Sequence, residues 1–171
     1  MRVHGIGTVV IEPGASQTYF TGVRWSRSER LTAAVIPVEG EALIVTPFFE
    51  EPSIRETLNV PAEVRVWQED EDPLRLIADW VRGKRLKGAI GIEETARFFV
   101  SDGLAQRMPG ERFVSANPVV RGCRMIKTAP EIALMQAATD VTVAAYRWTW
   151  PRVEAGMTGS DVAALMQAAT R

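Results

Sequence analysis

The side chains that most often perform covalent catalysis are scarce in this sequence. It contains one histidine, His4, and one cysteine, Cys123. A Ser-His-Asp or Cys-His arrangement needs a histidine base, and we expect His4 to be ordinary surface in an N-terminal arm. One His and one Cys also cannot supply the ligand shell of a zinc-type site. We therefore expect no such centre here, and a small, buried, apolar role for Cys123.

Carboxylates are numerous, but their spacing does not indicate a metal site. The densest run is Gln68–Asp72, "QEDED". Consecutive side chains point in different directions, and acidic residues before a helix favour its dipole, so this run predicts a solvated helix cap. Gly88 and Gly91 lack the Gly-x-Gly-x-x-Gly spacing of a nucleotide-binding loop. The sequence thus predicts neither metal nor nucleotide binding within this chain.

One cluster combines aromatic residues, a glycine and arginines in a loop-like stretch, "YFTGVRWSRSER" at 19–30. Arginine can hold a carboxylate through two parallel hydrogen bonds, and tryptophan can cover the apolar part of a ligand. Arg30 and Trp25 are therefore the candidate substrate-binding residues. The alternative for Arg30 is a surface ion pair with Glu29 or another acid. We expect the remaining members of the cluster to lie in the core (Tyr19 and Phe20) or to face solvent (Arg24 and Arg27).

Composition limits the class of protein. The 171 residues are 46% hydrophobic and 24% charged, with a net charge of −1. This suits a soluble domain with one well-buried core plus an appendage, and near-zero charge disfavours nucleic acid and anionic membranes as partners. A single cysteine, no membrane-length apolar run and no signal-peptide pattern lead us to expect a cytoplasmic protein.

Short apolar runs that alternate with helical stretches predict an α/β domain around these residues. Six strands are expected, over Thr8–Ile11, Leu31–Pro37, Ala42–Pro47 and the runs that begin at Glu63, Ala89 and Arg112. Gly40 lies in the turn "VEGE", which predicts an antiparallel hairpin and so a mixed sheet. Helices are expected over Phe48–Leu58, Pro73–Arg82 and Thr95–Arg107, covering the sheet.

The pattern changes after Asn117. "PVVRGCRMIK" at 118–127 is expected to be a short link, and everything from Thr128 onward to be a helical arm without strands. Thr128 and Thr158 each stand three residues before an acid, which is the spacing of a capping box. The first of the two helices is apolar around most of its circumference, so we expect it to be buried on two sides, with its second partner outside this sequence.

These segments resemble a known family. "YFTGVRWSRSERLTAAVIPVEGEALIVTP" resembles the Tyr-x-Thr-Gly segment, Glu-Arg pair and hairpin of the N-terminal domain of the creatinase/prolidase (Xaa-Pro peptidase) family. "RMIKTAPEIALMQAATDVTVAAY" and "EAGMTGSDVAALM" resemble its linker helix and the Gly-Met-Thr-x-x-Asp-Val continuation. The resemblance implies a creatinase N-terminal-like domain over 1–124, then a linker and the first two helices of a truncated pita-bread catalytic domain over 125–171. The helix that usually precedes the first strand has no counterpart here, so a shortened N-terminus is also expected.

The resemblance also implies a function. The parent would be a metal-dependent Xaa-Pro dipeptidase or aminopeptidase and a homodimer, acting on proline-containing dipeptides or small peptides. Two divalent metal ions (Mn, Co or Zn) would lie in the catalytic domain and none in this chain. This chain would serve dimerisation and wall the substrate site without being catalytic itself, with Arg30 at the family's Glu-Arg position. The alternatives are a non-catalytic peptide-binding or assembly module, and the N-terminal domain of a creatinase-type amidinohydrolase.

Overall fold

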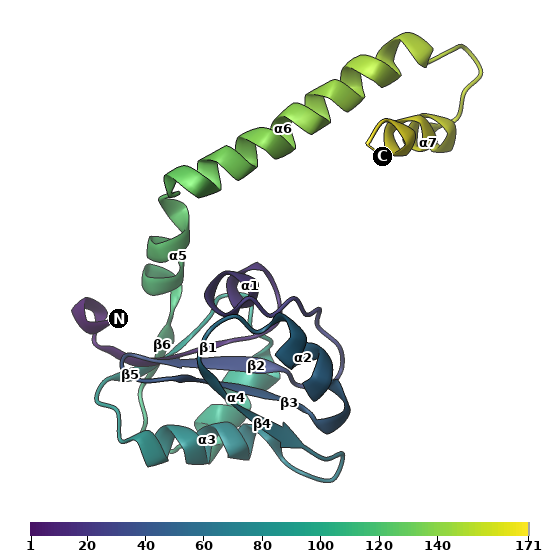
Figure 1. The fold of residues 1–171 in the computed structure, drawn as a ribbon. Coiled ribbons are helices and arrows are strands. Elements are labelled where there is room, and N and C mark those ends of the chain that lie inside the picture. Colours follow the sequence, from purple (N-terminus) through teal and green to yellow (C-terminus); the bar gives the residue numbers. More distant parts are fainter. Residues whose placement is uncertain (171) are drawn as a thin grey trace. The chain divides into compact units, whose positions relative to one another are not determined.

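A computed structural model describes residues 1–170 (Figure 1). Two compact units are distinguished, Met1–Met125 and Ile126–Arg171, and each is described by itself. The first is a mixed six-stranded sheet flanked by helices, as the sequence predicts. Its strands are β1 (Ile6–Ile11), β2 (Ala33–Pro37), β3 (Ala42–Pro47), β4 (Ala62–Trp67), β5 (Ala89–Ile92) and β6 (Phe113–Ser115).

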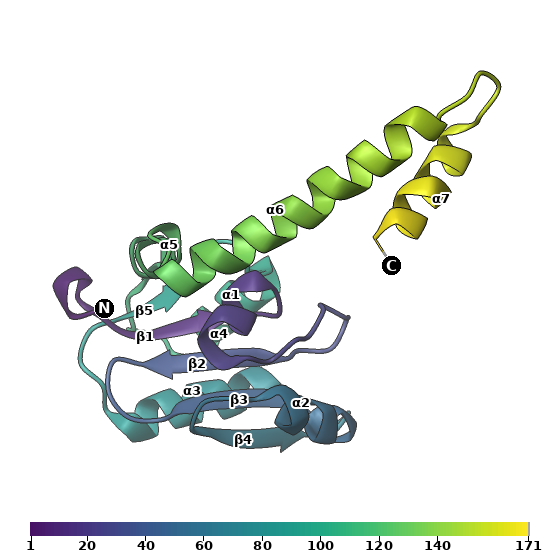
Figure 2. The same ribbon diagram turned by 45° about the horizontal axis from the view of Figure 1, so that its top comes forward.

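The strands are arranged in the order β4-β3-β2-β1-β5-β6. The hairpin of β2 and β3 is antiparallel, as predicted, and β2 is also antiparallel to β1. The pairs β1–β5, β5–β6 and β3–β4 are parallel. Every strand except β2 therefore runs in one direction, and the neighbouring strands β1 to β4 are seen side by side in Figure 2.

Alternating side chains build a core on each face of the sheet. On one face Val10, Val35 and Leu43 pack with α3 (Pro73–Lys84) and α4 (Phe98–Arg107). On the other face the core includes Val9 and Ile44 of the sheet, with Ile54 and Val120 from the helices that cover it. The helices on this second face are α1 (Ala15–Thr21), α2 (Glu51–Thr57) and α5 (Asn117–Met125), with short 3₁₀ turns at Arg2–His4 and Phe48–Glu50 (Figure 1). Because successive strand residues point to opposite faces, strands buried on both sides are almost wholly apolar.

Helix replaces the start of one expected loop and most of the expected link, which corrects the sequence prediction. The stretch expected as a loop after residue 19 begins inside α1, and the expected link at 118–127 contains most of α5. Tyr19, expected in the core, is exposed, and its hydroxyl donates to the Cys123 carbonyl oxygen at 3.0 Å. Cys123, expected to be buried, is exposed as well. The reason is that α5 buries only Val120 fully, which leaves its other residues near the surface.

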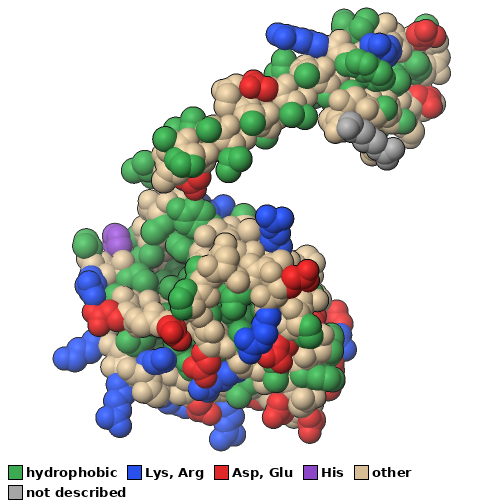
Figure 3. Space-filling model, in the orientation of Figure 1, with side chains coloured by type: hydrophobic (Ala, Val, Ile, Leu, Met, Phe, Trp, Pro, Cys, Tyr) green, Lys and Arg blue, Asp and Glu red, His purple; other side chains and the backbone are tan. Residues whose placement is uncertain are grey.

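The second unit contains α6 (Ala129–Thr149), a 3₁₀ turn at Trp150–Arg152 and α7 (Gly159–Ala169). Both predicted capping boxes are present: Thr128 with Glu131, and Thr158 with Asp161. Only Ala145 and Thr149 of α6 are buried, and α7 buries no residue fully. Hydrophobic side chains lie exposed along this unit, with few charged ones among them (Figure 3). Within residues 1–170, none of the helices has both the length and the apolar character needed to cross a bilayer.

Candidate functional site

The carboxyl edge of the sheet gathers charged side chains that follow or precede several strands. Parallel strands end at the same edge, and the antiparallel β2 begins there. Residues that follow four different strands therefore meet those that precede β2. The four acids are Glu12 after β1, Glu50 after β3, Glu69 after β4 and Glu93 after β5; Arg30 precedes β2.

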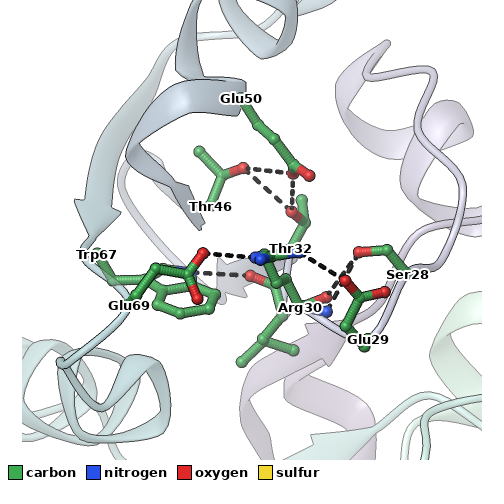
Figure 4. A network of polar contacts seen from close by, with 9 residues as sticks. Ser28, Glu29, Arg30, Thr32, Thr46, Glu50, Trp67 and Glu69 are labelled. Atoms are coloured by element: carbon green, nitrogen blue, oxygen red, sulfur yellow. Dashed lines mark hydrogen bonds and ion pairs between the residues drawn. The ribbon is translucent and has the colours of Figure 1, made fainter.

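Arg30 lies at the centre of this edge and is held by two carboxylates (Figure 4). Its Nε donates to Glu69 Oε1 at 2.6 Å, and its Nη1 donates to Glu29 Oε1 at 2.5 Å. The guanidinium also lies over the Phe49 ring, 5.4 Å from the centroid. The hydrogen bond to Glu69, followed by the charge of Glu69 itself, raises the pKa of Arg30 above its ordinary value. The side chain is thus a permanent cation at the surface.

The contacts of Arg30 are those of the surface ion pair considered as the alternative, and they are open to water. The Glu29 and Glu69 side chains are 79% and 59% exposed. Ion pairs this exposed contribute little free energy, so a carboxylate ligand could replace Glu29 at small cost. The substrate-binding role of Arg30 therefore stays a prediction that this geometry permits.

A buried polar group supports the strand start beneath Arg30. The hydroxyls of Thr32 and Thr46 lie 3.0 Å apart, and both lie within hydrogen-bond distance of Glu50 Oε2 (Figure 4). Trp67 Nε1 donates to the Leu31 carbonyl oxygen at 2.9 Å. These bonds satisfy polar groups that would otherwise be costly to bury, and they fix the backbone immediately after Arg30.

Trp25, the other predicted site residue, has a different environment. It is partly buried and packs against the core cluster that contains Val9, Ile44 and Ile54. Among residues 1–170, no hydrogen bond or ring contact joins Trp25 to Arg30. The structure therefore does not bring the two predicted residues into direct contact, and a ligand would have to extend between them. Arg24 and Arg27 are exposed, as predicted.

Sequence reasoning missed a second set of polar residues at this edge. Glu12 is 1% exposed and Glu93 is 5% exposed, and each directly follows a strand. Glu12 is paired with Arg97, and Glu93 accepts from the hydroxyls of Ser16 and Thr95. The signal was present in the sequence, because a glutamate ends both apolar runs, "TVVIE" and "AIGIE".

Exposed aromatic rings add apolar surface to the edge. Phe48 and Phe49 follow β3, and Phe98 and Phe99 begin α4 after the β5 turn; their exposed fractions range from 41% to 77%. Arg97 lies over the Phe99 ring, 4.7 Å from its centroid. Aromatic and arginine side chains are the residues enriched where protein surfaces meet. The edge thus combines cationic and apolar groups suited to contact with a peptide or another protein surface.

Within residues 1–170, no group of three or more His, Cys, Asp or Glu side chains converges as it would to hold a metal ion. The acids of the edge are instead divided among arginine, serine and threonine partners. The residues of this part of the chain do not fit a dinuclear metal centre.

Comparison with known proteins indicates relatives for nearly the whole chain. The model of the creatinase/prolidase N-terminal domain matches residues 1–126. An uncharacterized peptidase of Schizosaccharomyces pombe is 28% identical over 177 residues, covering 95% of this chain and 38% of that protein. A probable dipeptidase PepE of Mycobacterium tuberculosis is 29% identical over 162 residues, covering 94% of this chain and 42% of that protein. The chain thus spans about two fifths of the length of these relatives.

Solved structures show the same fold. The dipeptidase PepE of Mycobacterium ulcerans superposes with a TM-score of 0.78 and 28% identity, over 98% of this chain and 46% of that one. A prolidase of Thermococcus sibiricus superposes with a TM-score of 0.84 at 20% identity, over 98% of this chain and 47% of that one. The second likeness concerns the fold alone.

Proposed function

The chain belongs to the creatinase/prolidase N-terminal domain family, and from that premise we propose that it is the N-terminal domain of a metal-dependent Xaa-Pro dipeptidase or aminopeptidase. The observation that carries the proposal is that relatives described as peptidases or dipeptidases match about 95% of the chain yet are more than twice as long. The parent would hydrolyse the bond before proline in dipeptides or small peptides. It would act in the cytoplasm as a homodimer.

In this proposal the present chain is not catalytic. Residues 1–170 offer no converging set of metal ligands. The two divalent ions expected for the family (Mn, Co or Zn) would be held by residues of a further catalytic domain. We propose a domain boundary near 124/125, with residues 125–171 forming the linker and first helices of that domain. The exposed apolar side chains of α6, such as Leu134 and Val141, support this division because such surface needs a covering partner.

The role proposed for residues 1–124 is to wall the substrate site and to contact the second subunit. Arg30 would bind the substrate carboxylate, since a planar guanidinium matches a carboxylate with two parallel hydrogen bonds. Trp25 would pack against the apolar part of the substrate. The position of Arg30 at an exposed edge, beside the Phe49 ring, supports this assignment.

The experiment compares the 171-residue chain with the full-length parent for hydrolysis of Xaa-Pro dipeptides and for bound metal. We expect hydrolysis and stoichiometric metal in the parent only. One tightly bound ion per 171-residue chain, or hydrolysis by that chain, would overturn the division of roles. Creatine, assayed in parallel, separates an amidinohydrolase from a peptidase. A parent inactive on both substrates would favour the binding or assembly module.

A further inference from the structure

The loop that carries both predicted site residues has no regular secondary structure. It extends from Gly22 to Thr32, between α1 and β2. A loop without ladder hydrogen bonds takes its position from side-chain contacts to a rigid scaffold. The contacts that fix this loop therefore decide where Arg30 lies.

One such contact begins at Glu12, which directly follows β1. Its side chain is fully buried, and it accepts from the Arg97 backbone N–H at 2.6 Å and from Arg97 Nε at 2.8 Å. A buried carboxylate is tolerated only when it is paired and hydrogen-bonded, and both conditions are met here. Glu12 therefore holds Arg97 at the residue before α4 begins.

Arg97 makes a third hydrogen bond, and its acceptor belongs to the loop. Its Nη1 donates to the Ser28 carbonyl oxygen at 2.5 Å. The planar guanidinium donates to Glu12 through Nε and to the loop through Nη1 at the same time. A lysine ammonium cannot make both bonds with the same geometry. Arg97 thus links the carboxyl end of β1, the start of α4 and the loop backbone.

Ser28 passes this constraint on to Arg30. The Arg30 backbone N–H donates to Ser28 Oγ at 3.2 Å, so the two residues form one compact turn. A second contact holds the loop one residue before Ser28. Arg27 donates to Thr95 Oγ1, and the Thr95 hydroxyl donates to the buried Glu93. The loop is therefore fastened to the ends of both β1 and β5, immediately before Arg30.

We propose that Arg97, held by Glu12, is a positioning residue that presents Arg30 at the carboxyl edge of the sheet. This inference rests on the proposed role of Arg30 as the contact for the substrate carboxylate. A pair that only joined the end of β1 to the start of α4 would need no bond to the loop. The bond to Ser28 is additional, and it constrains the path of the loop.

The first test uses NMR to measure amide exchange and backbone order parameters of the loop in the 171-residue chain that carries Arg97→Lys. Lysine keeps the charge beside Glu12 but loses the simultaneous bond to Ser28. We expect the Arg30 amide to exchange at least several-fold faster and order parameters over 22–32 to fall toward about 0.6 or below, while β1 and β5 amides are unchanged. The matched control is Arg107→Lys, because Arg107 also forms a half-buried pair, with Asp72, but does not contact the loop.

A second variant covers the case in which Arg97→Lys destabilises the whole unit. Glu12→Gln combined with Arg97→Met removes both charges together, so no unpaired charge is left buried. The loop should again become mobile while the sheet remains folded. Unchanged exchange and order parameters in the loop of either folded variant would overturn the proposal.

The second test uses the full-length parent and compares a free dipeptide with its C-terminally amidated form. Arg97→Lys should raise KM for the free dipeptide several-fold and leave kcat nearly unchanged, with little effect on the amide. In an Arg30→Ala background the same substitution should have no further effect. Equal losses on both substrates would mean a general structural role and would overturn the positioning role. If Arg30→Ala alone leaves the free dipeptide unaffected, the proposed carboxylate contact fails, whereas the NMR test still decides whether Arg97 holds the loop.

Discussion

At the scale of single residues, Arg30 donates hydrogen bonds through Nε and Nη1 to two carboxylates that are largely exposed to water. Such bonds are easily exchanged for equivalent ones. A ligand carboxylate that bound the guanidinium beneath another protein surface would be shielded from water. Its hydrogen bond would then be stronger than the exposed bond that either glutamate makes.

Arg30→Ala in the full-length parent should therefore lower kcat/KM for a free Xaa-Pro dipeptide by about tenfold or more, because a charge-assisted hydrogen bond is lost. The C-terminally amidated substrate should respond little. Steady-state kinetics on both substrates provide the measurement. Arg24→Ala is the matched control, since Arg24 is an exposed arginine of the same loop. Equal responses of the two substrates, or none, would show that the assignment is wrong.

Only part of this edge could be predicted from residue types. Arg30 was identified because its aromatic and glycine neighbours are unusual, and its pairing with Glu29 was foreseen as the alternative. Glu12 and Glu93 each end an apolar run, which places them after a strand, but nothing local in the sequence shows that they are buried or that Arg97 pairs with Glu12. Their roles depend on β1 and β5 lying side by side, which is a long-range pairing that no local pattern specifies.

At the scale of elements, Gly7 determines how β1 meets β5. The register shifts between Ile6 and Thr8, and a Cβ on Gly7 would lie 2.5 Å from the Lys87 carbonyl oxygen. That oxygen belongs to the backbone and cannot rotate away. The irregularity in the strand pairing therefore requires a residue without a side chain.

Gly7→Ala should lower the free energy of unfolding by about 1–3 kcal/mol, as is typical of overpacked sites. Urea denaturation of the 171-residue chain measures this. Gly83→Ala is the control: Gly83 lies in α3 with open space around it, so alanine should be neutral or stabilising by up to about 1 kcal/mol. Equal stability losses for the two variants would contradict the close-approach argument.

The capping box of α6 gives the second element-scale prediction. Glu131 accepts from the Thr128 backbone N–H and, less strongly, from its hydroxyl, and these bonds lower the pKa of the Glu131 carboxyl below its ordinary value of 4.5. A lowered folded-state pKa stabilises the helix start above the ordinary value, and this stabilisation is lost as pH falls through the lowered pKa.

Amide protection factors of Thr128, Glu131 and Ile132, whose N–H groups are bonded at this helix start, should therefore decrease as the solution is acidified below pH 4.5. Hydrogen exchange followed by NMR across this range gives the measurement. Glu131→Gln keeps an amide oxygen as acceptor but has no titrating proton, so its protection should not depend on pH in this window. The same acid-induced loss in the glutamine variant would refute a role for this carboxyl.

Helix prediction was most reliable where capping or apolar periodicity was present. Thr128 and Thr158 mark helix starts correctly because the capping box is a local signal. Helix α1 was missed because its buried residues are the polar Ser16, Gln17 and Thr21, so no apolar stripe appears in the sequence. Glycines flank it on both sides, Gly14 before its first residue and Gly22 after its last, and Gly22 has a φ of 78°. Helix α5 was missed because it is short and buries a single residue.

At the scale of the whole molecule, the second unit exposes the apolar residues that the sequence predicted to need a partner. Leu134 is 72% exposed and Val141 is 54% exposed, and their spacing of one heptad places them on the same side of α6. An apolar strip of this kind promotes association when its covering partner is absent.

The 171-residue chain should therefore associate with itself as its concentration rises, as measured by sedimentation velocity. The double variant Leu134→Lys with Val141→Lys should shift the equilibrium toward the monomer by breaking the strip with charge. Val3→Lys is the control, because Val3 is 95% exposed but lies in the first unit. A chain that remains monomeric at every concentration tested would show that the apolar strip does not drive association.

The reversed direction of β2 has a practical consequence for anyone who wishes to attach this protein to a surface or a dye. Because β2 begins at the edge that holds Arg30 and β3 returns to that edge, the turn at 38–41 lies at the opposite end of the strands, roughly 17–20 Å away. Gly40 in that turn has a φ of 88°, and a Cβ added there would meet no heavy atom within 4 Å beyond its chain neighbours. A short peptide tag inserted at this turn would project into solvent, so the molecule could be immobilised or labelled there while the Arg30 edge stays free for binding measurements.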